Sequence, residues 1–261
     1  MNAIARLIGE RIAEARAAAP DRPALIGVGG AQGSGKSFHC RAYAEARPRT
    51  AHFSLDDVYL TKAERDELAH TAHPLFATRG SPGTHDLDLA DRVIASLAQA
   101  APDARTRIPR FNKAADDRAP ENDWPVFVGQ PEAILVEGWC MGAKPPPRDP
   151  PMNDVEREDA DGVWRDAMHD ALALDYADFF AAFDAIIYLQ APSWEIVRRW
   201  RGEQEEETLG RALTAEENAA LDRFVMHYER ITRAMLAGHH SAGWIVHLDE
   251  ARKVVRVEER V

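Results

Sequence analysis

The stretch that most constrains this chain is GAQGSGKS at residues 30–37, which follows the apolar run ALIGVGG at residues 24–30. It satisfies the pattern G-x-x-x-x-G-K-[ST]. A short apolar run that ends in glycines and leads into a helix is typical of an interior strand of a parallel sheet. The glycines let backbone N–H groups turn toward an anion, and the helix adds the partial positive charge of its N-terminus. The sequence therefore predicts a strand, a phosphate-binding loop and a helix in direct succession.

The expected phosphate contacts fall on consecutive residues: Gly30, Ala31, Gln32, Gly33, Ser34, Gly35, Lys36 and Ser37. We expect the Lys36 ammonium to reach the β- and γ-phosphates of ATP, and the Ser37 hydroxyl to ligate Mg²⁺. The loop alone leaves open whether the chain is a kinase, a hydrolase that works as a switch, or a nucleotide binder.

The composition restricts the partners of such a site. A chain of 261 residues is long enough for one α/β domain, and its formal net charge of -11 argues against a nucleic acid or an anionic membrane as partner. No run approaches the ~18 apolar residues of a membrane span. Cys40 and Cys140 are far apart and lack CxxC partners, which favours a reducing compartment. We expect a soluble cytoplasmic protein, either a monomer or a weak homo-oligomer.

Apolar runs alternate with helical patterns along the rest of the chain. After the first strand, strands are predicted at residues 51–55, 133–139, 184–192 and 243–250, and residues 253–261 could return as a hairpin partner. Helices should begin near Gly35, Thr61, Ser193 and Thr214, because capping residues precede helical periodicity there. This order predicts an α/β fold with a doubly wound parallel sheet of about five strands. One domain should span residues 1–261, with an irregular insertion at about 71–130 and a Pro-rich loop at about 138–160.

Two predicted strands end in carboxylates. SLDDVYL places Asp56 and Asp57 after the second strand, where alternation lets only one of them point into the site. Transfer of a phosphoryl group to a hydroxyl needs a carboxylate that accepts the proton, and Asp56 is the candidate, with a further role near Mg²⁺. The alternative is a carboxylate pair that caps the turn. AILVEG has the form of a Walker B strand, so Glu137 should face the metal.

Arginines follow the fourth predicted strand in IVRRWRGEQEEE. A helical lid of a small-molecule kinase can bring an arginine over the γ-phosphate, and Arg198 and Arg201 are the candidates ahead of Arg199. The alternative is that these arginines pair with the glutamates that follow them.

The segment FNKAAD does not fit the N-K-x-D signature of a GTPase. Its acid, Asp116, lies one residue too far from Asn112 and Lys113, and no strong strand precedes the segment.

Several segments in register resemble the glycerate kinase family of P-loop kinases, the plant-type D-glycerate 3-kinases with their bacterial and fungal relatives. They are GAQGSGKS, SLDDVYLTKAERDELA, HPLFATRGSPGTHDL, IPRFNKAADDRAP and ILVEGWCMG. The resemblance covers roughly residues 24–142, and the segment at 200–231 extends it. That family is similar to the uridine kinase, phosphoribulokinase and pantothenate kinase group, whose motif D-x-F-[YH] carries the catalytic aspartate. Here the motif falls on Asp56, Asp57, Val58 and Tyr59, with Val58 departing from the usual aromatic residue.

The resemblance also implies acceptor contacts. They fall on Asp57, Tyr59, Arg79, His85, Asp86, Arg110, Lys113 and Trp139. Arg110 and Lys113 are the nearest cations for an acceptor carboxylate or phosphate, and Trp139 should form a wall of the pocket. His85 could instead be structural, and Arg79 could simply hold its loop. Asn112 stands where the family more often has an acid, which bears on acceptor identity.

The resemblance implies a kinase that uses Mg-ATP to phosphorylate a hydroxyl of D-glycerate or a similar small polar metabolite. Alternative acceptors are a nucleoside, pantothenate or another sugar acid. From a different class, an ATP-binding regulator or assembly factor with slow hydrolysis stays open.

Overall fold

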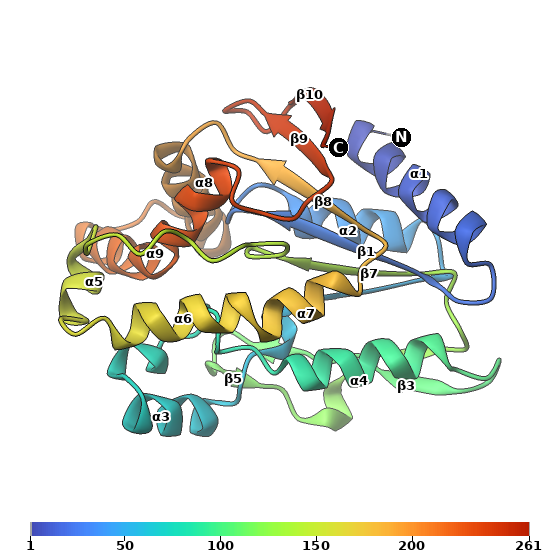
Figure 1. Cartoon of the computed structure of the whole chain (residues 1–261), viewed down its shortest axis with the longest axis horizontal. Coiled ribbons are helices and arrows are strands. Elements are labelled where there is room, and N and C mark those ends of the chain that lie inside the picture. Colours follow the sequence, from blue (N-terminus) through green and yellow to red (C-terminus); the bar gives the residue numbers. More distant parts are fainter. Residues whose placement is uncertain (1, 261) are drawn as a thin grey trace.

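The computed structural model describes residues 2–260, and a six-stranded sheet forms its centre (Figure 1). The strand order is β10-β9-β8-β1-β7-β2. The strands are β1 (Ala24–Gly30), β2 (Thr50–Ser54), β7 (Ala133–Gly138), β8 (Ala185–Gln190), β9 (Trp244–Leu248) and β10 (Val254–Glu259). All neighbours pair in parallel except β10, which returns antiparallel to β9. The predicted doubly wound sheet and its hairpin partner are confirmed, and only Val261 of that partner lies outside the described residues.

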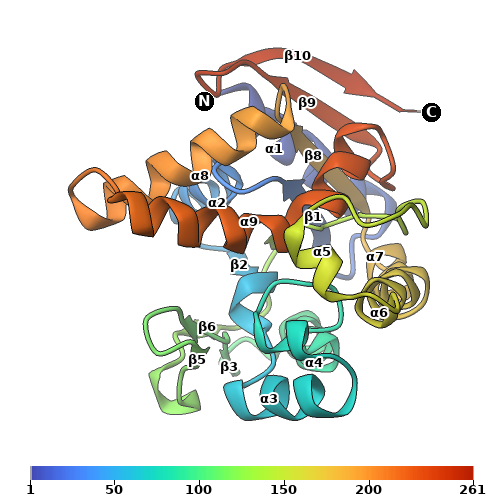
Figure 2. The ribbon, with the colours of Figure 1, turned by 90° about the vertical axis from the view of Figure 1, so that its left-hand side faces the viewer.

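Helices cover both faces of the sheet (Figure 2). One face carries α1 (Ala3–Ala18), α2 (Lys36–Glu45) and α8 (Trp194–Leu209). The other face carries α4 (Leu87–Ala98), α6 (Val163–Ala173) and α7 (Asp175–Ala181). Helix α9 (Ala215–Leu236) contributes Val225 to the first core and Tyr228 to the second. Since β1 is buried along its whole length, its sequence reads as a continuous apolar run rather than an alternating one.

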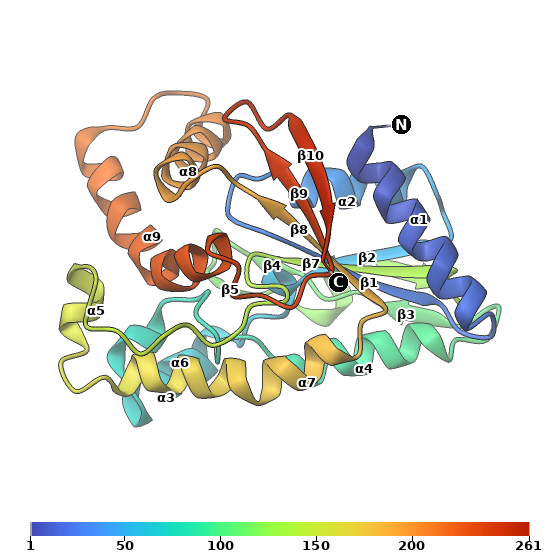
Figure 3. The same cartoon turned by 45° about the horizontal axis from the view of Figure 1, so that its top comes forward.

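The carboxyl ends of β1, β2 and β7 meet at one edge of the sheet. Glu137 of β7 lies opposite Val28 of β1 on one side and Ser54 of β2 on the other. The phosphate loop therefore begins beside Glu137, and the turn that carries Asp56 begins on its other side. This edge is where ligands bind in open parallel sheets. Helices α8 and α9 form a hairpin beyond it (Figure 3).

Strand β2 ends earlier than the sequence predicted. Asp56 and Asp57 lie not on a strand but in the short 3-10 helix η1 (Leu55–Val58). The reason is local capping: the Ser54 hydroxyl accepts the Asp56 N–H at 3.1 Å, and the Asp57 carboxylate accepts the Ser54 N–H at 3.0 Å. Asp57 thus has the capping role that was the alternative for the pair, and strand alternation does not decide which acid faces the site.

The segment between β2 and β7 forms a layer of its own beyond the β2 edge (Figure 2). Besides α4, it contains α3 (Lys62–Thr71), η2 (Pro74–Ala77), β3 (Arg105–Arg107), β4 (Phe111–Asn112), β5 (Asp117–Arg118), η3 (Glu121–Asp123) and β6 (Val126–Val128). The predicted capping box of Thr61 and Glu64 opens α3. Strand β3 pairs with β6 and β4 with β5, so the region is less irregular than its prolines suggested.

The Pro-rich loop is anchored to α9 by one buried arginine. Arg230 donates to the Pro150 carbonyl oxygen at 2.7 Å and makes two bonds to the Glu156 carboxylate, at 2.7 and 2.5 Å. Glu156 lies on the short helix α5 (Asp154–Glu158), which the sequence did not predict, and its side chain is 1% exposed. The loop is thus packed against α9 in this structure and does not stand free as a flap.

The described residues contain no helix both long and apolar enough to cross a membrane.

We predict that Arg230→Leu lowers the free energy of unfolding by about 3–5 kcal/mol, because it leaves the Glu156 carboxylate buried without its partner. The measurement is urea unfolding followed by circular dichroism. Arg223→Leu is the matched control: Arg223 pairs with Glu158 on the same two helices, but both side chains are about half exposed, so the loss should be about 0–1 kcal/mol. Equal losses in the two variants would contradict the anchoring role of Arg230.

Candidate active site

The phosphate loop has the backbone that its sequence predicted. Gly33 and Gly35 have φ of 74° and 88°, in the left-handed region that side chains disfavour. A Cβ on Gly33 would also lie 2.6 Å from the Cβ of Trp200, so α8 packs directly on the loop. Gly35 precedes the first turn of α2 and supplies no side-chain cap. The loop therefore leaves the N-terminal N–H groups of α2 available to an anion such as a nucleotide phosphate.

Behind the loop, Glu137 is a buried carboxylate with one oxygen to spare. The Ser37 hydroxyl donates to its Oε1 at 2.7 Å, and the Lys36 ammonium lies 4.0 Å from Oε2. Oε2 is buried and has no hydrogen-bond partner among residues 2–260. Burial raises the pKa of Glu137, and the Lys36 charge opposes that rise. A hydroxyl and an unsatisfied carboxylate oxygen side by side fit the oxygen ligands or water ligands of Mg²⁺, so the residues present suit the expected metal.

Asp56 is held as an anion by its neighbours. The Lys113 ammonium lies 2.8 Å from its Oδ2, and the Tyr59 hydroxyl donates to its Oδ1 at 2.8 Å. Burial alone would raise the pKa of Asp56, but Lys113 and Lys36 outweigh it, and the pKa falls well below its usual range. The Asp56 charge in turn raises the pKa of Lys113. An ionised carboxylate that lies within the field of the phosphate-loop lysine can accept a proton from a hydroxyl.

Asp57 and Arg110 satisfy each other. Arg110 Nη1 lies 3.1 Å from the Asp57 carboxylate, which also caps η1. Burial raises the pKa of Asp57, although the Arg110 charge opposes that rise. Arg110 is 40% exposed, so its guanidinium keeps an open side toward the solvent.

The turn at residues 79–84 is fixed by aromatic side chains from three elements. The Tyr228 hydroxyl of α9 donates to the Arg79 carbonyl, and the Trp139 indole donates to the Gly80 carbonyl, at 2.9 and 3.1 Å. The Tyr176 hydroxyl of α7 accepts the Gly83 N–H at 3.2 Å. With its backbone held in this way, Arg79 directs its guanidinium to an ion pair with Asp116. Trp139 is 3% exposed, and its ring meets the Tyr228 ring with centroids 4.9 Å apart; its role as a wall of the pocket stays a prediction.

His85 and Asp86 have structural partners. The His85 ring stacks on the Tyr59 ring at 4.7 Å, and its Nδ1 lies 2.5 Å from the Tyr176 hydroxyl. Burial lowers the pKa of His85 to about 4, so the ring is neutral at pH 7. Asp86 caps α4 by accepting the Leu89 N–H at 2.8 Å, and its other oxygen pairs with Arg118 at 3.0 Å. These contacts agree with the structural alternative for His85, while a role of Asp86 in acceptor binding stays a prediction.

The arginines of α8 point in different directions. Arg198 pairs with Asp222 of α9, whereas Arg199 pairs with Glu250 after β9 at 3.0 Å and with Glu203 of its own helix at 3.6 Å. Arg201 pairs with Glu205 at 2.5 Å, as the alternative reading expected, and its guanidinium lies 5.8 Å from the centre of the Phe224 ring. Burial raises the pKa of Tyr228, and the Arg201 charge is among the groups that oppose this rise. Arg201 therefore lies toward Phe224 and Tyr228 of α9, and its role over a γ-phosphate stays a prediction.

Sequence reasoning missed Tyr228, Tyr176 and Asp116. The two tyrosines lie on helices far along the chain, and nothing in their local sequence distinguishes them from core aromatics. The sequence drew attention to Asp116 only as the acid of FNKAAD, whose spacing does not fit a GTPase. Its φ of 52° places it in a tight left-handed turn, from which it meets Arg79.

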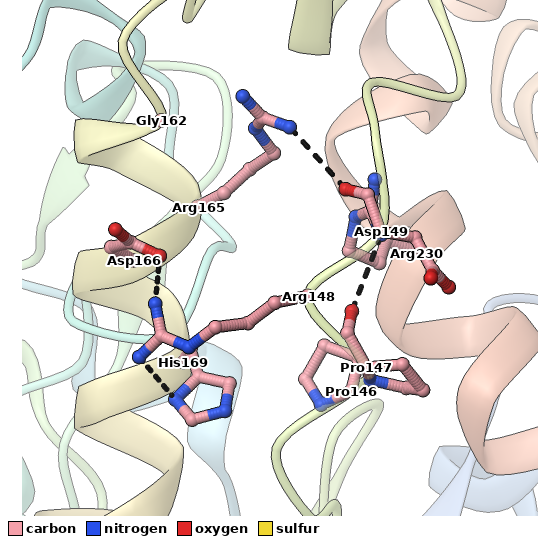
Figure 4. A pocket seen from close by; sticks show the side chains of 9 residues that line it. All are labelled: Pro146, Pro147, Arg148, Asp149, Gly162, Arg165, Asp166, His169 and Arg230. Carbon is pink, nitrogen blue, oxygen red and sulfur yellow. Dashed lines mark hydrogen bonds and ion pairs between the residues drawn. The ribbon is translucent and has the colours of Figure 1, made fainter.

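A separate cavity of about 160 Å³ lies between the Pro-rich loop and α6 (Figure 4). It is lined by Arg148, Arg165 and Arg230, but each of them already has an acid: Asp166, Asp159 and Glu156. No lining residue belongs to the phosphate-loop cluster. The matched charges leave no cationic site for an anion here.

The fold, the phosphate loop and the carboxylates above it define a P-loop kinase of small molecules, with an alcohol group as acceptor. No family model matches the chain. A Schizosaccharomyces pombe protein described as "uncharacterized kinase mug58" is 31% identical over 223 residues, which cover 79% of this chain and 79% of that protein. The chloroplastic D-glycerate 3-kinase of Arabidopsis thaliana is 30% identical over 195 residues, or 69% of this chain but 40% of that longer protein.

A solved structure of D-glycerate 3-kinase from Cryptococcus neoformans has the same fold, with a TM-score of 0.76 over 100% of both chains at 21% identity. The chain belongs to the D-glycerate 3-kinase-like family of P-loop kinases. This confirms the resemblance drawn from its motifs, and the kinase assignment excludes the GTPase reading.

We predict that Lys113→Met moves the acid limb of the kcat/KM pH profile upward by about 1–3 pH units, because the cation that holds Asp56 ionised is removed. Asp56 is ionised at every pH above its pKa in the folded chain, and Lys113 lowers that pKa. Without Lys113 the pKa rises, so Asp56 becomes protonated, and activity falls, at a higher pH. Lys62→Met is the control, since Lys62 is an exposed lysine 3.7 Å from Asp66 on α3. An acid limb that stays in place in Lys113→Met would contradict the proposed control of Asp56.

Proposed function

We propose that this chain transfers the γ-phosphoryl group of ATP to a hydroxyl of D-glycerate. The observation that carries the proposal is the Asp56 carboxylate, held ionised by Lys113 and Tyr59 beside the phosphate loop. The similarity to a protein named D-glycerate 3-kinase supports the choice of acceptor.

Residues 30–37 would hold the nucleotide phosphates through backbone N–H groups and the Lys36 ammonium. Ser37 and Glu137, with Asp56 nearby, would hold Mg²⁺ directly or through water, because the spare Glu137 oxygen needs a partner. Bound magnesium would neutralise phosphate charge during the transfer. Trp200 packs against Gly33, so the fold already supports this part of the loop before a nucleotide binds, which would lower the cost of ordering it.

Asp56 would accept the proton of the acceptor hydroxyl. Its low pKa makes it a weak base, so its role is to orient the hydroxyl and to take the proton as the oxygen–phosphorus bond forms. Tyr59 fixes the direction of the carboxylate, and the stacked His85 ring fixes Tyr59. Arg201 would stabilise charge on the transferring group from the lid side.

The cations near Asp56 favour an acceptor with a single carboxylate. Arg79, Arg110 and Lys113 each pair with one aspartate, and Arg65 shares Asp116 with Arg79, so the cluster has one positive charge in excess before any substrate binds. A small monoanion can share such paired cations, whereas a phosphorylated acceptor would bring a second charge without a further cation.

We also propose that residues 71–130 serve as the acceptor-site insertion of a single kinase domain. The cytoplasmic location and the monomeric or weakly oligomeric state stay predictions of the sequence.

We predict that D-glycerate alone stimulates ADP release from Mg-ATP in a panel with L-glycerate, uridine, pantothenate and ribulose 5-phosphate. The measurement is a coupled assay of ADP release. Stimulation by a different compound would show that D-glycerate is not the acceptor, while the kinase activity would be retained. ADP release that no acceptor changes would instead favour the regulator with slow hydrolysis.

Asp56→Asn should lower kcat by about 10²–10⁴, because the amide cannot accept the proton. The affinity for ATP, measured by calorimetry, should stay within a few-fold of wild type. Asp88→Asn, in the first turn of α4, is the control with the same chemical change away from the site. Turnover that survives in Asp56→Asn would rule out Asp56 as the proton acceptor.

A further inference from the structure

One large apolar side chain lies exposed directly beside the phosphate loop. Phe38 is 70% exposed, more than any other large hydrophobic residue that the structure describes. It follows Ser37 in the first turn of α2. Fully burying a phenylalanine side chain contributes about 1.5–3 kcal/mol of favourable free energy, so a ligand that covered this ring would gain part of it.

The backbone of Phe38 belongs to the anion site. The hydrogen bonds of α2 begin with the His39 N–H, which donates to the Gly35 carbonyl at 3.0 Å. The Phe38 N–H precedes that bond and is one of the free donors of the helix N-terminus. A nucleotide whose phosphates occupy these donors would have its sugar and base next to the first turn of α2, and this turn carries the exposed Phe38 ring.

The ring is supported on one side only. His39 meets it in a T-shaped contact, with ring centroids 5.3 Å apart and planes at 79°. His39 is itself tied to the start of α1, because its Nδ1 lies 3.2 Å from the Asn2 amide nitrogen. The structure records no other ring contact for Phe38 within residues 2–260, so a face of the ring stays open.

We propose that Phe38 is the stacking platform for the purine base of the nucleotide. The proposal rests on the nucleotide site of the proposed function, and it does not depend on which acceptor is phosphorylated. Aromatic rings stack on bases through their π-faces, and such stacking tolerates any base. Phe38 should therefore strengthen the binding of adenine and guanine nucleotides by similar factors, while another group selects between them.

The test compares ligands that share the phosphates and differ in the base. Calorimetry with Mg²⁺ measures the dissociation constants of ADP, GDP and inorganic tripolyphosphate for the wild-type chain and for Phe38→Ala, without an acceptor. We expect Phe38→Ala to weaken ADP and GDP about tenfold each and to leave tripolyphosphate within twofold. Phe38→Trp should retain wild-type affinity for ADP, because the larger ring also stacks.

Leu174→Ala is the matched control, since Leu174 is 64% exposed at the junction of α6 and α7. It should change none of the three dissociation constants. The tripolyphosphate value in each variant reports whether the phosphate loop is intact, so a folding defect is recognised directly.

Unchanged ADP affinity in Phe38→Ala would overturn the proposal. An equal loss for ADP and tripolyphosphate would also overturn it, because the effect would then lie in the phosphate loop. A wild-type chain that shows this pattern but does not phosphorylate D-glycerate would contradict only the choice of acceptor. A wild-type chain that binds neither ADP nor tripolyphosphate would contradict the nucleotide site itself.

Discussion

Glu137 is a carboxylate at the centre of the sheet, 3% exposed, and the Ser37 hydroxyl and the Lys36 ammonium compensate its burial. An ionised carboxylate buried without partners would be too costly to keep. Lys36 and Ser37 are the first residues of α2, directly after the phosphate loop, so their contacts with the buried acid hold the end of the loop against β7. The register of β1 with β7 and of β7 with β2 then places Asp56 on the other side of the same carboxylate.

A second layer of pairing organises the acceptor side. Asp56 and Asp57 each pair with one cation, and Asp116 pairs with both Arg65 and Arg79. These pairs connect η1 to the β4–β5 hairpin, to α3 and to the turn at residue 79. Paired groups of opposite charge cost less to bury than single ones, which allows a dense ionic cluster near a chemical site. The same pairing keeps Asp56 ionised and leaves the cluster with one positive charge in excess.

Helices α8 and α9 link the nucleotide side to the acceptor side. Trp200 of α8 packs on Gly33 of the phosphate loop, while Tyr228 of α9 holds the Arg79 carbonyl. Arg230 of α9 anchors the Pro-rich loop in addition. The helix hairpin therefore contacts both the loop that is proposed to bind the phosphates and the turn that is proposed to bind the acceptor, which is the arrangement that a lid needs.

The sequence alone determined the glycine-rich loop after β1, the alternation of strands and helices, the position of Glu137 near the end of a buried strand, and the family. These features are local in the chain: glycine φ values, apolar periodicity and capping boxes act over a few residues, so the sequence displays them directly. It also singled out Asp56 and Lys113, although it could not show that they pair.

Only the tertiary structure decided which polar residues face each other. A reciprocal cap ends β2 at Ser54, and Asp57 and Asp86 act as helix caps. The three arginines of α8 have different acidic partners: Asp222 for Arg198, Glu250 for Arg199 and Glu205 for Arg201. The tertiary structure also brought Tyr176 and Tyr228 to a turn some 90 to 150 residues earlier in the chain. Such contacts depend on how helices pack over a sheet, and the local sequence carries no record of that packing.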